Sequence, residues 1–550
     1  MKNKISIGLI LLLSLCTGVA CTNLDEELFS SVPDTEYYRN TAEVNTALNA
    51  VYAQLRGLYH HENTWGYNVV SSDECVVPGR GGNWVDGGKW LQINAHTWDQ
   101  YHPHLRGTYN RPMTGISRAN TLIERSASLE SSAELSRLQH EARFLRAFFY
   151  YEIMDMFGRA PLVTTAINPG NLPAAERSEL YAFVVSELEA IKDALPATAS
   201  YGRISSAAAY GLLAKLYLNE GVYNNDNFEV NAPSDEALNK VIAYADKVGT
   251  MGHSVYPDYL QTFSLAEEAA NTDYLLVATH LAQADFGNHG NCWWMHYAAA
   301  EINGQAVSAT HSKWNGFAVN TEFYNSYAEH DNRRAQLVTE FTDVDGIRWQ
   351  HQPEMGVFDI SDFQGVRVLK YNIDPAQAGI SWGGDGGNDF AILRYADVLL
   401  MKAEAQIRLG KNTEGLATIS AFRQQGGRFP AGDPYLNAET HQTDMGVSAL
   451  DFVLAERGWE MLWEGTRRQD LIRHGKYLGK WSNKTDANNT APIEVSYEKW
   501  NETNEVYEIV TENLYGPNAG QASDGKKRLV LPLPAAQISA NPNLSQTEGY

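Results

Sequence analysis

The chain has 550 residues and 44% of them are hydrophobic, so it can bury a large core. Its 43 basic and 66 acidic side chains give a net charge of −23, which repels phosphate backbones and anionic membrane faces. The composition therefore argues against a nucleic-acid-binding protein.

The first 20 residues have the features of an export signal. Two lysines precede a short apolar run, residues 5–15, that is too short to span a bilayer comfortably, so we expect cleavage. Small residues then precede Cys21, an arrangement similar to the bacterial lipobox, in which the cysteine is acylated; a plain secretory signal is the alternative. The acidic cluster at 25–27 resembles the surface-export tag of Bacteroidetes lipoproteins. We therefore predict a signal peptide over 1–20 and a lipid on Cys21.

Cysteine usage argues against a disulfide framework or a zinc site of the Cys-x-x-Cys type. One cysteine lies inside the signal, which leaves only Cys75 and Cys292 in the body of the chain. Two cysteines so far apart do not form a framework. They could pair or could be buried thiols, and the sequence leaves both possibilities open.

Helical periodicity dominates the body of the chain. It predicts helices over residues 43–58, 134–157, 177–195, 205–219, 235–248, 395–409, 413–424 and 450–477. Several of these form helix–turn–helix pairs, with small residues that would let helices approach closely (Ala207, Ala214, Ala396, Ala403 and Ala405). The pairs resemble tetratricopeptide repeats, although no strict period of about 34 residues appears. We predict a mainly α protein with a divergent tetratricopeptide-like helical-repeat scaffold and large irregular loops.

Long segments with poor helical periodicity separate these helices. They are rich in Gly, Asn, Asp, Trp and Tyr and cover residues 60–112, 275–320, 342–390 and 478–530. Long irregular insertions are usually functional or disordered, and the aromatic content argues against disorder. Nothing between them has the composition of a linker, so we predict a single domain over residues 21–550.

Motifs along the whole chain resemble one known family. Residues 390–405 (FAILRYADVLLMKAEA), 455–473 (AERGWEMLWEGTRRQDLIR) and 541–550 (NPNLSQTEGY) resemble the central hairpin, the acidic–basic helix and the tail of SusD/RagB proteins. Upstream, residues 141–147 (EARFLRA) and 157–161 (FGRAP) also fit. The matches follow the family order, and together they are highly specific.

The resemblance implies a SusD-like domain with an N-terminal part over about 21–330 and a C-terminal part over about 331–550. Members of this family are lipid-anchored proteins on the cell surface, bound to the outer membrane. They bind glycans or peptides beside a SusC-like TonB-dependent transporter, and they have no known catalytic residues. The resemblance thus implies binding of oligo- or polysaccharide for import, with no enzymatic activity and no cofactor. The alternatives are an oligopeptide-binding lipoprotein of the same family or, less favoured, a glycan-cleaving enzyme.

Two further patterns have a catalytic alternative. Residues 379–383 match the G-x-S-x-G nucleophile elbow with Ser381, but that motif needs a strand, a sharp turn and a helix in an α/β sheet. Acidic residues spaced four apart (Glu456, Glu460 and Glu464) have arginines nearby, which favours ion pairs on a helix surface over a general acid–base pair. We expect catalysis from neither.

Two patterns have a metal-binding alternative. Three histidines lie near Asp99 (His96, His102 and His104), but neither their spacing nor their context matches a zinc site, and we interpret them as surface histidines. Residues 343–346 resemble part of a calcium loop without its remaining ligands, so we expect an ordinary turn. We therefore predict no metal site.

Two aromatic loops are the candidate binding site. The first covers residues 72–90 and continues to Trp98 and Tyr101; the second covers 291–297 and continues to 313–315. In SusD-like proteins the ligand arc is built from these two regions. Sugars need flat apolar surfaces and polar groups for their hydroxyls, which side chains of the two loops would supply (Trp84, Trp293, Trp294 and Trp314; Arg80, Asn83, Asp86 and Asn315). The alternative is that Trp90, Trp98 and Trp314 are buried anchors.

Overall fold

The computed structural model describes most of the chain from residue 37 onward. The described residues are 37–80, 84–167, 170–264, 270–280, 316–342, 348–350, 364–368, 370–371, 388–478, 493–501, 506–514 and 525–550. Within these ranges no helix combines the length and the apolar character needed to cross a membrane.

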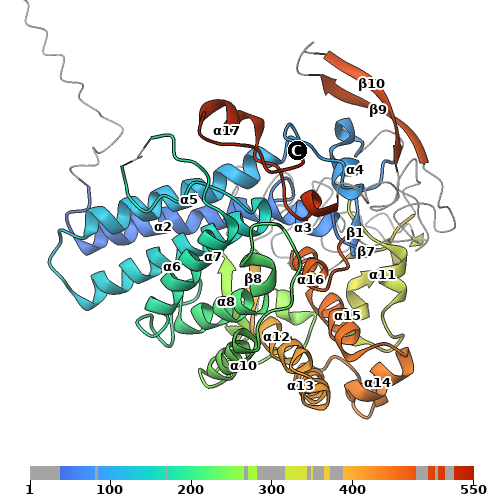
Figure 1. The fold of residues 1–550 in the computed structure, drawn as a ribbon. Coiled ribbons are helices and arrows are strands. Elements are labelled where there is room, and N and C mark those ends of the chain that lie inside the picture. Colours follow the sequence, from blue (N-terminus) through green and yellow to red (C-terminus); the bar gives the residue numbers. More distant parts are fainter. Residues whose placement is uncertain are drawn as a thin grey trace, which may run out of the picture.

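Three long helices lie alongside one another at the start of the described chain (Figure 1). They are α2 (Thr41–Leu58), α5 (Leu105–Ser126) and α6 (Ala133–Phe157), and each packs against the other two. Helix α2 begins after Asn40, whose side chain accepts a hydrogen bond from the backbone N–H of Glu43 and so satisfies one of the unpaired amides of the first turn. The three helices form one side of the molecule.

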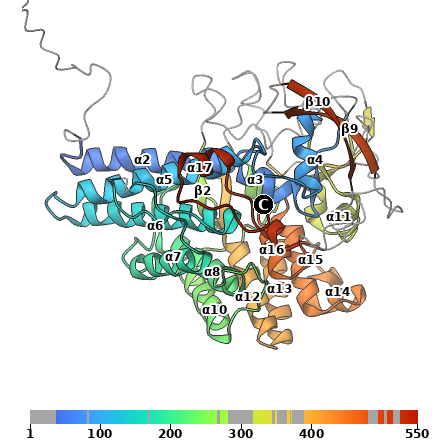
Figure 2. The same ribbon diagram turned by 45° about the horizontal axis from the view of Figure 1, so that its top comes forward.

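The helical array continues with five further helices, each of which packs against the one that precedes it in the array (Figure 2). In chain order these are α7 (Arg177–Ile191), α8 (Ser206–Leu218), α10 (Asp235–Gly249), α12 (Tyr395–Arg408) and α13 (Asn412–Gln425). The alanines expected at their contacts are fully buried (Ala207, Ala214, Ala396, Ala403 and Ala405). The prediction of a mainly α scaffold of stacked helical pairs is confirmed.

Shorter helices position the loops. These are α3 (Thr64–Val70), α4 (Lys89–Asn94), α9 (Glu220–Tyr223), α11 (Thr321–Asn325), α14 (Ala438–Met445), α15 (Ala449–Met461), α16 (Arg467–Arg473) and α17 (Ala535–Ala540). The segment 60–112, expected to be irregular, therefore contains α3, α4 and the start of α5. That expectation was too broad, because this segment is helical in part.

Every sheet among the described residues has two antiparallel strands. The pairs are β1 (Cys75–Val76) with β3 (Ala318–Val319), β2 (Tyr274–Ala278) with β8 (Phe390–Arg394), β4 (Leu337–Val338) with β7 (Arg367–Val368), β5 (Glu340–Thr342) with β6 (Arg348–Gln350), and β9 (Ile493–Asn501) with β10 (Val506–Leu514). The pairs β1–β3, β2–β8 and β4–β7 join segments distant in sequence, whereas β5–β6 and β9–β10 pair neighbouring strands. The hairpin β9–β10 extends beside α4 (Figure 1).

The helix predicted over 450–477 is interrupted. Helix α15 ends at Met461 and α16 begins at Arg467, and between them Trp463 has a φ of 64°. Its buried ring meets that of Trp65 edge to face with ring centroids 5.7 Å apart, and its carbonyl accepts a hydrogen bond from the Trp65 indole. This packing outweighs the helical propensity of the sequence.

A buried charge network replaces the surface ion pairs expected at Glu456, Glu460 and Glu464. All three carboxylates are buried, and Glu464 lies beyond the end of α15, so that expectation was wrong. Glu460, for example, accepts hydrogen bonds from both Arg394 and Arg428, at 3.2 and 2.7 Å. The scaffold role of these carboxylates is confirmed. A buried charge is costly unless it is paired, and here each has a partner.

Candidate functional site

A short strand pair joins the first aromatic loop to the segment that directly follows the second. Strand β1 lies in the first loop, and β3 begins three residues after the second loop ends. Asn320 reinforces the junction, because its backbone N–H donates to the carbonyl of Glu74 and its side-chain amide donates to the carbonyl of Asp73. The start of the first loop therefore lies beside the segment that follows the second loop in sequence.

Trp84 lies at this junction. Its φ is 63°, which bulky residues rarely adopt, and its ring lies over Gly316. A Cβ atom at Gly316 would lie 2.3 Å from Cζ2 of Trp84, so only glycine leaves room for the ring. The ring also contacts Phe317 and Trp90, with centroids 5.6 and 6.2 Å apart. The side chain is half-buried, so part of it is packed and part is accessible.

Trp90 and Trp98 are buried anchors, as the alternative interpretation expected. Each is 1% exposed. The Trp90 indole donates to the Asp86 carboxylate at 2.9 Å, and the Trp98 indole donates to the hydroxyl of Tyr550 at 2.8 Å. Both rings hold the first loop against the body and offer little surface to a ligand.

The polar candidates in the first loop differ in accessibility. Arg80 is buried, and its guanidinium donates to the backbone carbonyl of Gln364. The Asp86 side chain is 42% exposed and lies 3.5 Å from the ammonium of Lys89. Asp86 therefore presents a carboxylate beside Trp84, whereas Arg80 fixes the loop. Ligand contact by either residue stays a prediction.

Other predicted positions lie outside the described residues. These are Cys21, Asn83, Cys292, Trp293, Trp294, Trp314, Asn315, residues 343–346 and Ser381. The described chain resumes at Gly316, directly after the second loop, and the ring of Trp84 lies over this residue.

Two acidic residues at the start of the first loop are structural. Asp73 binds Arg467 through two hydrogen bonds of 2.7 and 2.8 Å and so ties the loop to α16. Glu74 is fully buried, and burial raises its pKa well above the ordinary value although Arg467 opposes the shift. Asp73 and Glu74 therefore anchor the first loop to the helical scaffold.

The three histidines near Asp99 are buried, so their interpretation as surface residues was wrong. An imidazole nitrogen of His96 lies 2.8 Å from the carbonyl of Ser71. The two nitrogens of His102 lie 2.5 Å from the hydroxyl of Tyr67 and 3.0 Å from the carbonyl of Lys89. His96 and His102 therefore hold parts of the first loop in place, through the carbonyls of Ser71 and Lys89.

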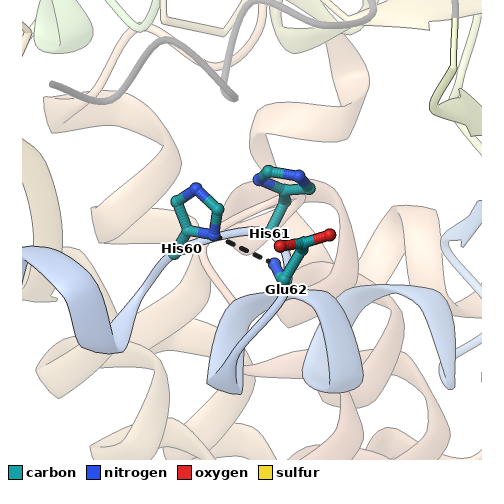
Figure 3. Close-up of side chains that lie close together, drawn as sticks. All are labelled: His60, His61 and Glu62. Carbon is teal, nitrogen blue, oxygen red and sulfur yellow. Dashed lines mark hydrogen bonds between the residues drawn. The ribbon is translucent and has the colours of Figure 1, made fainter. Parts of the chain in front are cut away.

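A separate cluster, His60, His61 and Glu62, was not anticipated from the sequence. It lies between α2 and α3, and its three side chains gather on one side of the turn (Figure 3). One potential ligand atom from each lies within 4.8 Å of the others, and this is the only such group of metal-binding side chains in the described ranges. Adjacent histidines followed by an acid directly after a helix were the available signal.

The stacked helical pairs form a scaffold. This scaffold holds a half-buried tryptophan, Trp84, beside the β1–β3 strand pair, as a ligand-binding protein would. Comparison with known families identifies the family to which this scaffold belongs. The model of the SusD family matches residues 217–550, and a model described as starch-binding, associating with the outer membrane, matches residues 32–218. The chain belongs to the SusD family.

Individual relatives are distant but cover nearly the whole chain. The starch-binding protein SusD of Bacteroides thetaiotaomicron is 24% identical, over 89% of this chain and 86% of its own. SusD-like protein P2 of Formosa agariphila is 23% identical, over 99% and 98%. Among solved structures, a SusD homologue from B. thetaiotaomicron has a TM-score of 0.72 with 19% identity, covering 94% of this chain and 98% of its own. A laminarin-binding SusD-like protein has a TM-score of 0.65 with 20% identity, covering 92% and 99%.

Proposed function

We propose that this protein binds an oligo- or polysaccharide at the outer membrane and delivers it to a partner transporter without cleaving it. Membership of the SusD family supports the proposal, since relatives are named for binding starch and laminarin. The proposed ligand surface comprises Trp84, Asp86 and the residues of the second loop.

The observation that carries the proposal is the position of Trp84. Its ring packs against Gly316 and Phe317, the two residues that directly follow the second loop. A rigid, half-buried aromatic ring suits the apolar C–H face of a sugar, and it loses little entropy on binding. The exposed carboxylate of Asp86 lies two residues away and can accept hydrogen bonds from hydroxyl groups.

Anchoring and partnership complete the proposal. Acylation at Cys21 would hold the protein at the outer membrane on the cell surface, within a domain over residues 21–550. A tethered binding protein has a high effective concentration near a membrane transporter. We assign the transporter to the SusC-like, TonB-dependent class that the sequence motifs imply.

Binding can be tested on a glycan array that includes starch and laminarin, followed by calorimetry on the glycans that bind. We expect Trp84→Ala to weaken binding by about 1 kcal/mol or more, the value of one aromatic contact. Gly316→Ala should act in the same direction because the added Cβ displaces the Trp84 ring. Bound glycan should be recovered uncleaved.

The matched control is Tyr201→Ala, which removes a partly exposed ring between α7 and α8. It should leave glycan affinity unchanged. Binding of peptides but of no glycan would favour the oligopeptide alternative, and cleavage lost on changing a single carboxylate would favour an enzyme. Equal glycan affinity of Trp84→Ala and the unmodified protein would remove Trp84 from the site.

A further inference from the structure

The cluster His60–His61–Glu62 has the donor set of a metal site. Two imidazoles and one carboxylate converge, with one potential ligand atom from each within 4.8 Å of the others (Figure 3). His61 is 7% exposed, whereas the Glu62 side chain is 44% exposed, so the cluster is half enclosed and still reachable from solvent. Imidazole with carboxylate is the donor set of zinc and similar ions, whereas calcium and magnesium take oxygen ligands.

A second, independent feature points into the same cluster. His104, at the start of α5, is 3% exposed, and neither of its imidazole nitrogens has a hydrogen-bond partner within the described residues. Its Nε2 lies 3.8 Å from Oε1 of Glu62. A buried imidazole without hydrogen bonds is costly, and a bound ion would satisfy it.

We propose that His60, His61 and Glu62, joined by His104, bind a divalent transition-metal ion of the zinc class. Zinc ligands lie about 2.0–2.2 Å from the ion, so neighbouring ligand atoms in a tetrahedral site are about 3.4 Å apart. The separations in the cluster are at most 4.8 Å, and that from His104 to Glu62 is 3.8 Å. Metal binding would require side-chain rotations that shorten these separations and draw His104 toward the other three groups.

Two present interactions compete with the metal. The ammonium of Lys89 lies 2.9 Å from Oε1 of Glu62, the atom that faces His104, and it also lies 3.5 Å from the carboxylate of Asp86. When a metal takes Glu62, Lys89 keeps Asp86 as its partner. The hydrogen bond from the Glu62 amide to His60 Nδ1 is 3.3 Å long and therefore weak.

The metal would brace the proposed ligand surface. The rings of His61 and His104 flank Trp90 with centroids 5.9 and 4.8 Å away, and Trp90 in turn contacts Trp84. An ion held by both imidazoles would fix Trp90 between the end of α2 and the start of α5. This effect on Trp84 rests on the proposed function, whereas metal binding itself does not.

The test uses the full chain in mild detergent, without an oligohistidine tag, and Zn²⁺ competed against a chromophoric chelator. We expect about one equivalent of tightly bound Zn²⁺ in the absence of any glycan. Glu62→Gln and His61→Gln should each weaken binding by about 10-fold or more, and His104→Gln should also weaken it. Lys89→Met should tighten binding, because it frees Glu62.

The matched control is His330→Gln, at a side chain that is 47% exposed and lies outside the cluster; it should leave zinc affinity unchanged. Circular dichroism of each variant verifies folding, and the visible spectrum of the Co²⁺-loaded protein reports its nitrogen and oxygen ligands. Absence of stoichiometric binding, or binding that Glu62→Gln and His61→Gln leave intact in folded protein, would overturn the proposal. Because no glycan is present, failure here is separate from failure of the proposed function.

Discussion

At the scale of single residues, Glu152 in α6 links the stability of the fold to pH. Its carboxyl is buried and accepts a hydrogen bond of 2.6 Å from Tyr59. Burial raises its pKa from the ordinary value of 4.5 to about 8, and the nearby Asp155 adds to the rise. Glu152 is therefore mostly protonated at neutral pH in the folded protein.

We predict that the carboxyl of Glu152 contributes stability in acid that is lost in base. A carboxyl whose folded pKa is raised contributes stability that is complete below about pH 4.5 and is lost as the pH rises through about 8. Glu152→Gln keeps a neutral side chain at every pH. Its free energy of unfolding, relative to the unmodified protein, should therefore increase from pH 5 to pH 9 by on the order of a few kcal/mol.

Urea unfolding followed by circular dichroism at several pH values measures this difference. Glu130→Gln, at an exposed carboxyl between α5 and α6, is the control and should show no such trend. A constant difference between Glu152→Gln and the unmodified protein from pH 5 to pH 9 would refute the assignment.

At the scale of secondary-structure elements, buried ion pairs fix how α12, α13 and α15 meet. Arg394, directly before α12, is fully buried and binds Asp273, Glu460 and Glu464 at 2.6, 3.2 and 2.7 Å. It therefore connects the strand pair β2–β8 to α15. Such pairs specify one arrangement of these elements because every alternative leaves a buried charge without a partner.

We predict that Arg394→Met lowers the free energy of unfolding by about 3–5 kcal/mol, the usual cost of removing one partner from a buried pair. The control is Lys402→Met on α12, which removes a surface pair with Asp246. Exposed pairs contribute about 0–1 kcal/mol, so this variant should be nearly as stable as the unmodified protein. Chemical denaturation measures both, and similar losses for the two variants would contradict a structural role for the buried network.

Most of the long helices could be predicted from periodicity, because their apolar residues repeat without interruption. Helix α5 was missed, and its sequence explains why: it contains Pro112, and at Gly115 a Cβ would lie 2.3 Å from the ring of Phe149 in α6. A glycine needed for close packing weakens the helical signal. The interruption after α15 was also missed, because it depends on the packing of Trp463 against a distant tryptophan.

The candidate site could be predicted only in part. Aromatic composition and motif position selected Trp84, but its contact with Gly316 depends on the β1–β3 pairing, which joins distant segments. The cluster at His60 had a local signal in two adjacent histidines followed by an acid, whereas the approach of His104 to Glu62 joins segments distant in sequence. Contacts between distant segments leave no local pattern.

At the scale of the whole molecule, we predict that Cys21→Ala releases the protein from the outer membrane. The reason is that Cys21 would carry the lipid that holds the protein at the membrane. Fractionation of cells and mass spectrometry of the N-terminal peptide measure the outcome. If the variant stays in the membrane fraction and the unmodified protein carries no lipid, the anchor is wrong.

The same preparation tests the partnership. Capture of the acylated protein from membranes in mild detergent should enrich a TonB-dependent transporter, identified by mass spectrometry. A point variant away from the loops, such as Lys402→Met, serves as a control for fold and should capture the same partner. Recovery of the protein without any transporter would count against the partnership.

The buried charge network also sets an order for folding. The cations that neutralise Glu460 come from residues 333, 394 and 428, all of which precede it in the chain. During synthesis or export from the N-terminus these arginines emerge before α15. Arg333 and Arg394 have Asp331 and Asp273 as earlier counterions, whereas the ion pair of Arg428 has to wait for Glu460. We therefore expect the charge network in the middle of the protein to be completed late, once the last third of the chain supplies α15.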